Sequence, residues 1–215
     1  MSEGKRLPTI AAYALPTEAE LPAPRPDWRL AADRAALLIH DMQAYFVGAF
    51  EPDAQPMARA IPNMARLIER CRTLGAPVVY TAQHGAQDPR DRGLQADFWG
   101  PGMRAIPEHE TIVGALTPQA ADLRLVKHRY SAFQRSNLAE LMRARGRDQL
   151  IVCGVYAHIG CALTAGEAFQ RDIQPFLVAD ALGDFSREKH DLALAQVGSC
   201  CGVVRSTRQV LEALS

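Results

Sequence analysis

The sequence predicts an α/β protein: a single domain in which a doubly wound, six-stranded, mostly parallel sheet is the middle layer of a three-layer sandwich. Two observations predict this class. Short apolar runs alternate along the chain with longer stretches of helical periodicity, an order typical of βαβ units. The short runs are apolar at nearly every position, as expected for parallel strands that helices cover on both faces.

The first half of the chain supplies three of the expected strands, at residues 35–40, 77–83 and 123–128. Between the first two, residues 57–74 place apolar side chains on one helical face, and Gly75 is the expected C-terminal stop. Residues 85–107 lack clear periodicity. A loop of that length inside a compact domain is usually functional, for instance as a lid.

The second half continues the alternation. A helix is expected from Ser136, which would cap it, to Gly146, which would end it. The other expected elements are strands at 149–155, 175–181 and 202–206, a helix at about 159–171, a helix from Ser186 to about residue 200, and a closing helix capped by Thr207.

Proline content divides the chain into two parts. Five prolines lie within residues 1–34, which we expect to form an extended N-terminal arm over the surface. Residues 35–215 are expected to form the domain itself, since a chain of 215 residues is most simply one domain.

Charge and cysteine content narrow the function classes. Lys+Arg and Asp+Glu both number 24, which leaves no basic field for nucleic acid or an anionic membrane. No apolar stretch approaches the roughly 20 residues of a membrane span, and no signal peptide is apparent. The five cysteines contain no Cys-x-x-Cys pair and are expected to be reduced. We therefore expect a cytoplasmic protein that acts on a small molecule, with no nucleic-acid or membrane partner.

Three expected strands end in polar residues that could carry chemistry: Asp41, Gln83 and Lys127. Right-handed crossovers bring the carboxyl ends of parallel strands to one edge of the sheet, where ligands bind in such folds. A carboxylate and an ammonium group that meet there could form an acid–base pair. Two structural alternatives stay open: Asp41 could cap a turn, and the two charges could form a purely structural ion pair.

The fourth strand leads into the sequence GVYAHIGC, residues 154–161. A strand-to-helix turn here would aim the N–H groups of Ile159, Gly160 and Cys161 into the same crevice, and helix N-termini attract anions. Gly160 would let a ligand approach the backbone closely, because glycine has no Cβ. Tight packing between helix and sheet would explain the same glycine equally well.

Several motifs together resemble one known family. The sequence contains LLIHDMQ-x-YF, YTAQ, DFWGPGM, LVK-x-RYSAF and GVYAHIGC, followed by DIQPFLVADAL-x-DFSREKH. These motifs, in this order, resemble the isochorismatase family. They are most similar to isochorismatase domains of siderophore pathways and to the phenazine-pathway hydrolase that acts on 2-amino-2-deoxyisochorismate. The resemblance covers nearly the whole chain and implies the isochorismatase-like hydrolase fold.

The resemblance also implies residue roles. Asp41 would donate a proton to a vinyl ether with Lys127 beside it, and no metal or organic cofactor would take part. The implied substrate-binding residues are Gln83, Arg92, Trp99, Tyr130, Tyr156, Gly160 and Phe46. Sequence alone leaves open whether Phe46 and Trp99 pack in the core or line the pocket. The resemblance further implies a homodimer, and His128 stands where close relatives have Trp, which could alter one pocket wall.

The expected activity is hydrolysis of the enolpyruvyl ether of isochorismate, which is dianionic, or of 2-amino-2-deoxyisochorismate, which carries the same two carboxylates, with release of pyruvate and a dihydro-hydroxybenzoate or -anthranilate. A neutral Asp41 is needed as the general acid, although Lys127 alone would favour its ionised form. The substrate's carboxylates would offset the lysine, with Arg92 and the Gly160 turn holding them. The product would serve siderophore, phenazine or related secondary-metabolite biosynthesis.

Two alternatives come from other classes. A cysteine amidase of the nicotinamidase type would use Cys161, although the superfamily's nucleophile aligns with Gly160, about 100° away around a helix. The zinc-binding pattern of nicotinamidases is absent after Gln83, where His84 stands alone. A non-catalytic docking partner is the other alternative, but such a protein would need none of Asp41, Lys127 and Gly160.

Overall fold

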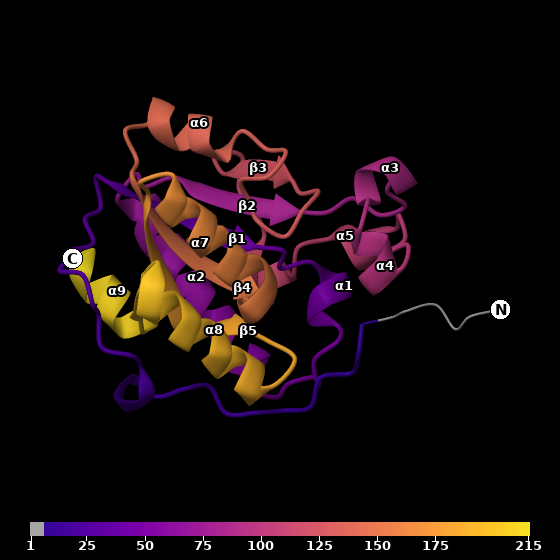
Figure 1. Cartoon of the computed structure of the whole chain (residues 1–215), viewed down its shortest axis with the longest axis horizontal. Coiled ribbons are helices and arrows are strands. Elements are labelled where there is room, and N and C mark those ends of the chain that lie inside the picture. The colour runs from indigo at the N-terminus through magenta and orange to yellow at the C-terminus, as the bar shows by residue number, and fades with distance from the viewer. Residues whose placement is uncertain (1–6) are drawn as a thin grey trace.

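The computed structural model describes residues 7–215 and contains one six-stranded sheet (Figure 1). The strands are β1 (Ala35–His40), β2 (Val78–Ala82), β3 (Leu123–Val126), β4 (Gln149–Val155), β5 (Gln174–Gly183) and β6 (Val203–Arg205). Their order is β3-β2-β1-β4-β5-β6, and every pair is parallel. The predicted fold class is confirmed, and the sheet is entirely rather than mostly parallel.

Strand β1 lies in the middle of the sheet because all six of its residues are buried. Its neighbours are β2, which pairs Ile39 with Tyr80, and β4, which pairs His40 with Gly154. The chain first builds outward from β1 to β3 and then returns to add β4 on the other side. The strand order therefore reverses between β1 and β4. Open α/β sheets bind ligands beyond the carboxyl ends of their strands at such a point.

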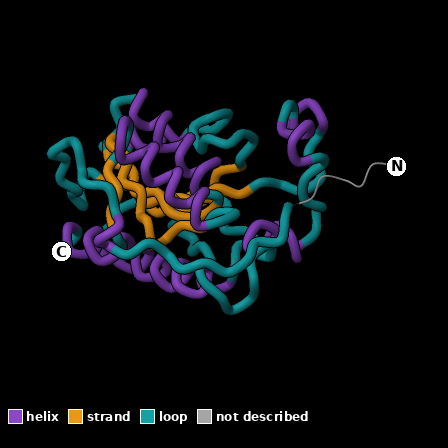
Figure 2. The backbone as a smooth tube through the Cα atoms, turned by 60° about the horizontal axis from the view of Figure 1, so that its bottom comes forward, coloured by secondary structure: helices purple, strands orange, loops and turns teal. Residues whose placement is uncertain are grey.

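Helices cover both faces of the sheet, so the strands must be apolar on both sides (Figure 2). One face carries α2 (Met57–Thr73) and α9 (Thr207–Ala213), whose buried residues join the core that includes Leu37 and Ile39. The other face carries α6 (Leu138–Ala144), α7 (Ala162–Gln170) and α8 (Arg187–Cys200), which pack around Leu38 and Val152.

Three of the expected helix ends are correct, and three need correction. Gly75 and Gly146 follow α2 and α6 with positive φ angles of 68° and 63°, and Ser186 accepts a bond from the Lys189 N–H at the start of α8. Helix α6 begins at Leu138, one residue later than expected, although the Ser136 hydroxyl still accepts from the Leu138 N–H at 3.3 Å. The cap of α9 is Ser206, in a capping box with Gln209, rather than Thr207. The helix expected from about 159 begins as a π-helical turn, Ala157–Cys161, before α7.

The stretch expected as an aperiodic loop, residues 85–107, contains short helices. Asp88 caps α3 (Pro89–Arg92), and α4 (Gln95–Trp99) follows. A third short helix, α5 (Pro107–Glu110), begins at the last residue of this stretch. Figure 1 shows α3, α4 and α5 together at one side of the molecule, beyond the end of β2. Helix α1 (Ala44–Val47), directly after β1, packs against α5. Helices of four or five residues are too short to show a period in the sequence.

Residues 7–34 run along the outside of the sheet layers, with one short 3-10 turn at Glu18–Glu20. The Ile10 N–H donates to the Ala49 carbonyl at 2.7 Å, and the Ile10 side chain is buried. Glu18 pairs with Arg208 of α9, and Arg25 donates to the carbonyl of Ser199 in α8. The remaining residues of the expected arm, 1–6, lie outside the described part of the chain.

Candidate active site

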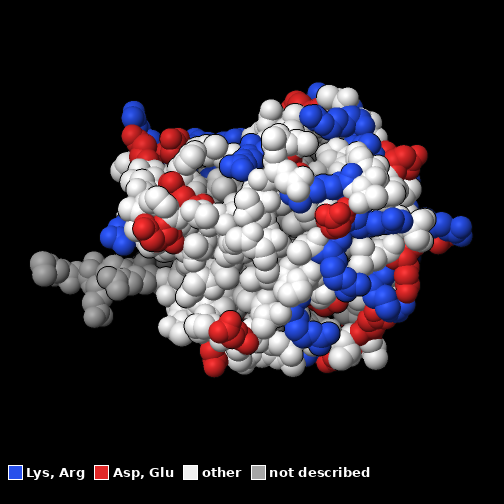
Figure 3. Space-filling view, turned by 180° about the vertical axis from the view of Figure 1, so that it is seen from behind, with Lys and Arg blue, Asp and Glu red and all other residues white. Residues whose placement is uncertain are grey.

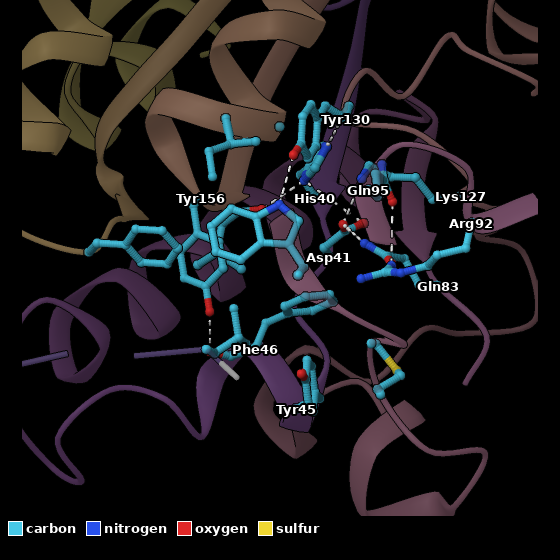
Figure 4. Close-up of a pocket in the computed structure, with 18 residues that line it drawn as sticks. His40, Asp41, Tyr45, Phe46, Gln83, Arg92, Gln95, Lys127, Tyr130 and Tyr156 are labelled. Atoms are coloured by element: carbon cyan, nitrogen blue, oxygen red, sulfur yellow. Dashed lines mark hydrogen bonds and ion pairs between the residues drawn. The ribbon is translucent and has the colours of Figure 1, made fainter. Parts of the chain in front are cut away.

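A cavity lies at the carboxyl ends of β1, β2, β3 and β4 (Figure 4). It takes side chains from each of these strand ends and from α1, α4 and the π-helical turn. All nine residues predicted for the site line this cavity: Asp41, Phe46, Gln83, Arg92, Trp99, Lys127, Tyr130, Tyr156 and Gly160. The position matches the point where the strand order reverses.

Asp41 and Lys127 form a buried ion pair at the floor of the cavity. The Lys127 Nζ lies 2.8 Å from the Asp41 Oδ2, and the two residues are 4% and 3% exposed. Gln83 donates from its Nε2 to the same oxygen at 3.2 Å. The three polar residues at the ends of β1, β2 and β3 therefore converge on one carboxylate, as Figure 4 shows.

Thr81 is a partner of Asp41 that sequence reasoning missed. Its hydroxyl donates to the Asp41 Oδ1 at 2.6 Å and accepts from the Asp41 N–H at 3.1 Å. Asp41 has a φ of 50°, a left-handed conformation that costs a non-glycine residue energy. The double contact with Thr81 holds that conformation and fixes the carboxyl group. The signal was available, because Thr81 lies two residues before Gln83 and points to the same face of its strand.

The charges around Asp41 favour its ionised form. Burial pulls the pKa of Asp41 upward, but Lys127, His40 and the hydroxyl of Thr81 together leave this pKa below its ordinary value. Removing one partner of such a buried pair would leave an uncompensated charge. Asp41 is therefore a carboxylate here, and a further negative charge nearby would be needed to favour the neutral acid.

Gln43, also missed in the sequence, positions the end of β2. It is fully buried, and its Oε1 accepts from the Gln83 N–H at 2.7 Å while its Nε2 donates to the Gln83 carbonyl at 2.8 Å. The same Nε2 donates to the Glu110 carbonyl at 3.0 Å. One side chain therefore ties β2 to α5 and holds the backbone from which Gln83 reaches Asp41.

Arg92 brings a second buried cation to the cavity. Its guanidinium donates only to uncharged oxygens: the Gly100 carbonyl at 3.1 Å, the Gln83 Oε1 at 3.3 Å and the Gln95 Oε1 at 3.4 Å. Arg92 is 7% exposed, and burial lowers its pKa. Among residues 7–215 no carboxylate forms an ion pair with Arg92. The cavity therefore presents a guanidinium that an anionic ligand could neutralise.

Aromatic residues form one wall of the cavity, and they also connect α4 to the rest of the protein. The Trp99 Nε1 donates to the Tyr130 hydroxyl at 2.7 Å. Phe185, which was not predicted, lies with its ring centroid 5.8 Å from that of Trp99 and 4.4 Å from that of Tyr156. Trp99 thus lines the pocket and also fastens the segment that carries it.

Tyr156 and Phe46 complete this wall. The Tyr156 hydroxyl donates to the Phe46 carbonyl at 3.0 Å, and their ring centroids are 6.1 Å apart. Burial raises the pKa of Tyr156, so its hydroxyl stays neutral. Phe46 is half-buried and both lines the cavity and packs against the core, so the two roles left open by the sequence are combined.

The turn around Gly160 differs from expectation. The N–H groups of Ile159 and Cys161 both donate to the Tyr156 carbonyl, at 3.1 and 3.3 Å, so neither points freely into the crevice. A Cβ on Gly160 would lie 2.1 Å from the His40 Cε1. The absence of a side chain at 160 is therefore required by His40, another pocket residue that the sequence analysis did not select.

The cysteine alternative fails on the geometry of Cys161. This residue is fully buried in the core between helices and sheet, and it does not line the cavity. Burial also raises the pKa of its thiol well above the ordinary value, which opposes formation of the thiolate nucleophile. Cys161 is therefore a core residue rather than the nucleophile of an amidase.

The described residues were also compared with what a metal site or a membrane-spanning helix would require. Residues 7–215 contain no group of three or more His, Cys, Asp or Glu side chains placed to hold a metal ion. His84 is exposed, and its Nδ1 lies 3.8 Å from Glu110. None of the helices in this range is long and apolar enough to cross a membrane.

Comparison with known proteins shows which protein family the chain resembles. Residues 35–209 match the family described as "Isochorismatase domain". The chain is 50% identical over 208 residues to a Bacillus subtilis protein named "Isochorismatase", covering 97% of this chain and 67% of that protein. It is 48% identical over 205 residues to "Phenazine biosynthesis protein PhzD" of Pseudomonas fluorescens, covering 95% and 98%.

A solved structure shares the fold. The crystal structure of a cysteine hydrolase from Pseudomonas syringae pv. phaseolicola superposes with a TM-score of 0.79 at 24% identity, covering 90% of this chain and 96% of that one. That likeness shows the architecture alone. The family match over most of the chain, with two relatives near half identity, shows more: this protein is an enzyme of the hydrolase class and belongs to the isochorismatase family.

Proposed function

We propose that the protein hydrolyses the enolpyruvyl ether of isochorismate or of 2-amino-2-deoxyisochorismate. The observation that supports this most directly is the Asp41–Lys127 pair, buried at 2.8 Å on the floor of a cavity that also holds Arg92. A vinyl ether is cleaved by protonation of carbon, which needs a placed acid and a site that anions enter. The names of the two relatives agree with this chemistry.

The reaction requires one proton and one water. The Asp41 carboxyl donates a proton to the terminal methylene carbon of the enolpyruvyl group, which leaves an oxocarbenium ion at the ether-bearing carbon. Water adds to that carbon and loses a proton, and the resulting hemiketal collapses to pyruvate and the ring alcohol. Asp41 regains its proton from the water, so the cycle closes without another reagent.

Substrate charge resolves the conflict at Asp41. Among the residues that line the cavity, two cations, Lys127 and Arg92, face the single negative charge of Asp41. A bound dianion reverses the balance to one excess negative charge, which a proton on Asp41 neutralises. The dianion thereby raises the pKa of Asp41, because a nearby negative charge favours the neutral acid. Binding and protonation of the acid are thus one coupled event.

The other pocket residues orient the substrate. Arg92 would hold a carboxylate through its fork of N–H groups, and Trp99 and Tyr156 would enclose the ring. Gln83 donates to Asp41 and lies between it and Arg92. It would therefore keep the carboxyl aimed at the substrate and is placed to position the attacking water.

Turnover with defined substrates tests the proposal. Pyruvate release from isochorismate and from 2-amino-2-deoxyisochorismate would be followed by NADH oxidation with lactate dehydrogenase, with nicotinamide hydrolysis measured in parallel. We expect turnover of at least one of the two ethers and none of nicotinamide. Absence of pyruvate from both ethers would contradict the function. The ratio of their kcat/KM values would identify the pathway, whether siderophore, phenazine or related.

The protein's assembly and location are further parts of the proposal. We propose a cytoplasmic homodimer, in line with the family resemblance and the free cysteines of the described chain. On the face shown in Figure 3, charges of both signs surround a broad uncharged area. Light scattering of the purified protein should give twice the mass of one chain, 23.5 kDa, and a monomeric mass would contradict the dimer.

A further inference from the structure

The ring of His40 links three segments that carry the site. His40 ends β1 and is 1% exposed. Its Nδ1 lies 2.8 Å from the carbonyl oxygen of Val155, and its Nε2 lies 3.2 Å from that of Tyr130. At least one of these contacts is an N–H···O bond, because imidazole always carries a ring N–H. Val155 ends β4, and Tyr130 follows Lys127 by three residues.

Two glycines leave the space in which His40 sits. A Cβ at Gly160 would come within 2.1 Å of the His40 Cε1 and 2.7 Å of its Nε2. A Cβ at Gly154 would lie 2.2 Å from the His40 carbonyl oxygen, and Gly154 has a φ of 117° that disfavours any other residue. Gly160 is therefore matched to the ring of His40, whereas Gly154 leaves room for the His40 backbone, whatever side chain residue 40 carries.

The contacts of His40 extend to both pocket walls. Through Val155, the ring holds the end of β4 directly before Tyr156. Through the Tyr130 carbonyl, it holds the residue whose hydroxyl accepts from Trp99 on α4. The next residue in the chain is Asp41, whose carboxyl must meet Lys127 at 2.8 Å. Figure 4 shows His40 between Tyr130 and Asp41.

We propose that His40 is the positioning residue of this site: its imidazole occupies the side-chain space of residue 160 and, through the Val155 and Tyr130 carbonyls, fixes the two walls between which Asp41 meets the substrate. This role goes beyond the proposed hydrolysis, which requires only an acid and bound anions. It makes residues 40 and 160 a matched set, in which a side chain gained at 160 requires the loss of the ring at 40.

A double-mutant cycle tests the matched set independently of activity. Gly160→Ala should lower the thermal midpoint of the parent by at least about 5 °C, and that of a His40→Ala background by less than about 2 °C, because neighbouring sites are not additive. Gly166→Ala is the control, since a Cβ there meets nothing within 4 Å. A harmless Gly160→Ala, or an equal loss in both backgrounds, overturns the proposal. If Gly160→Ala fails to fold in the parent but folds in the His40→Ala background, that result supports the proposal.

Hydrogen bonding is separated from space filling by two replacements. His40→Phe keeps a ring but has no N–H, and His40→Gln offers an amide N–H that can donate to Val155. We expect kcat to fall at least 30-fold in His40→Phe, since a displacement of about 1 Å can cost a hundredfold, while KM rises no more than about tenfold, the upper limit expected for loss of the Trp99–Tyr130 bond. His40→Gln should be at least fivefold faster than His40→Phe. Parental kcat in His40→Phe overturns the proposal, as does a His40→Gln no faster than it.

Tryptophan emission reports the wall itself. The sequence has two tryptophans, and Trp28 packs on Phe169 and Phe176 away from the cavity. In a Trp28→Phe background, His40→Phe should shift the emission of Trp99, because its bond to Tyr130 depends on the Tyr130 backbone. Unchanged emission would contradict the link to Tyr130. If the parent releases no pyruvate from either ether, the proposed function fails, while the cycle and the emission still judge His40.

Discussion

The Asp41 carboxyl has different requirements in the free and the liganded protein. Lys127, His40 and Thr81 outweigh the effect of burial and hold the pKa of Asp41 low, whereas the chemistry needs the neutral acid. Each hydrogen-bond partner that favours the carboxylate also fixes its direction. The same contacts therefore aim the acid, and only the ligand's charge changes its protonation state.

Replacing Asp41 by Asn should remove the acid while keeping the shape of the side chain. We expect pyruvate release to fall by at least about a hundredfold, within the range typical of general acids, and the circular dichroism spectrum to stay unchanged. The coupled pyruvate assay measures the rate. Asp148→Asn is the control, because that carboxylate pairs with Arg34 on the surface. Near-parental turnover by Asp41→Asn would exclude Asp41 as the proton donor.

The sequence predicted part of this site for a topological reason. Asp41, Gln83 and Lys127 each follow an apolar strand, so parallel strands had to bring them to one edge. His40 could not be assigned in the same way. Its role depends on Val155, 115 residues away, and on the glycine that makes room for its ring. Such non-local packing leaves no periodic pattern in the sequence.

Among the elements, predictability followed length and burial. Strand β4 was predicted with its observed limits because it is an uninterrupted, fully buried run. The α3 and α4 helices span four and five residues, less than the window in which a helical period can be recognised. At α6 and α9, adjacent residues of the capping type, such as Ser136 and Asn137, compete for one position. Tertiary geometry decides between them.

The cap of α8 provides a test at this scale. Ser186→Ala removes the oxygen that accepts from the Lys189 N–H at 3.2 Å, which should lower the free energy of unfolding by about 1 kcal/mol. Urea denaturation followed by circular dichroism measures the change. Ser199→Ala in the same helix is the control, because Ser199 is exposed near its C-terminal end. Equal stability of the two variants would show that the cap does not stabilise the helix.

The α4 segment should behave as a wall that can open. Trp99→Phe keeps an aromatic ring but removes the N–H that donates to Tyr130 at 2.7 Å, a bond worth about 0.5–1.5 kcal/mol. We expect KM to rise roughly threefold to tenfold, because the closed wall becomes less populated. Steady-state kinetics on the preferred ether checks this. Trp28→Phe should leave KM unchanged, and a Trp99→Phe variant with parental KM would argue against this function of the bond.

Across the whole molecule, positive and negative residues are equal in number, but they are not evenly distributed. Lys+Arg and Asp+Glu are equal at 24 each, and several arginines near the surface pair with carboxylates, as Arg34, Arg187 and Arg208 do. The cavity is different, since Lys127 and Arg92 face one carboxylate. An uncharged total therefore coexists with a pocket that attracts anions.

Binding of a dianion should consequently take up about one proton. The probe is 3-(1-carboxyethoxy)benzoate, whose saturated ether cannot react, titrated by calorimetry in two buffers with different heats of ionisation. The ligand raises the low pKa of Asp41, so between the free and bound pKa values the complex holds the extra proton, and affinity falls as pH rises through the bound value. Asp41→Asn should show no uptake. Binding by the parent without uptake would contradict the coupling.

The central position of β1 also affects how the chain emerges during translation. Its six buried residues pair with β2 on one edge and with β4, which ends at Val155, on the other. In a nascent chain, the apolar strand β1 is therefore paired on one edge only from the time β2 leaves the ribosome until β4 follows. We therefore expect a chain that stalls before residue 149 to be more prone to aggregate than one that has completed β4.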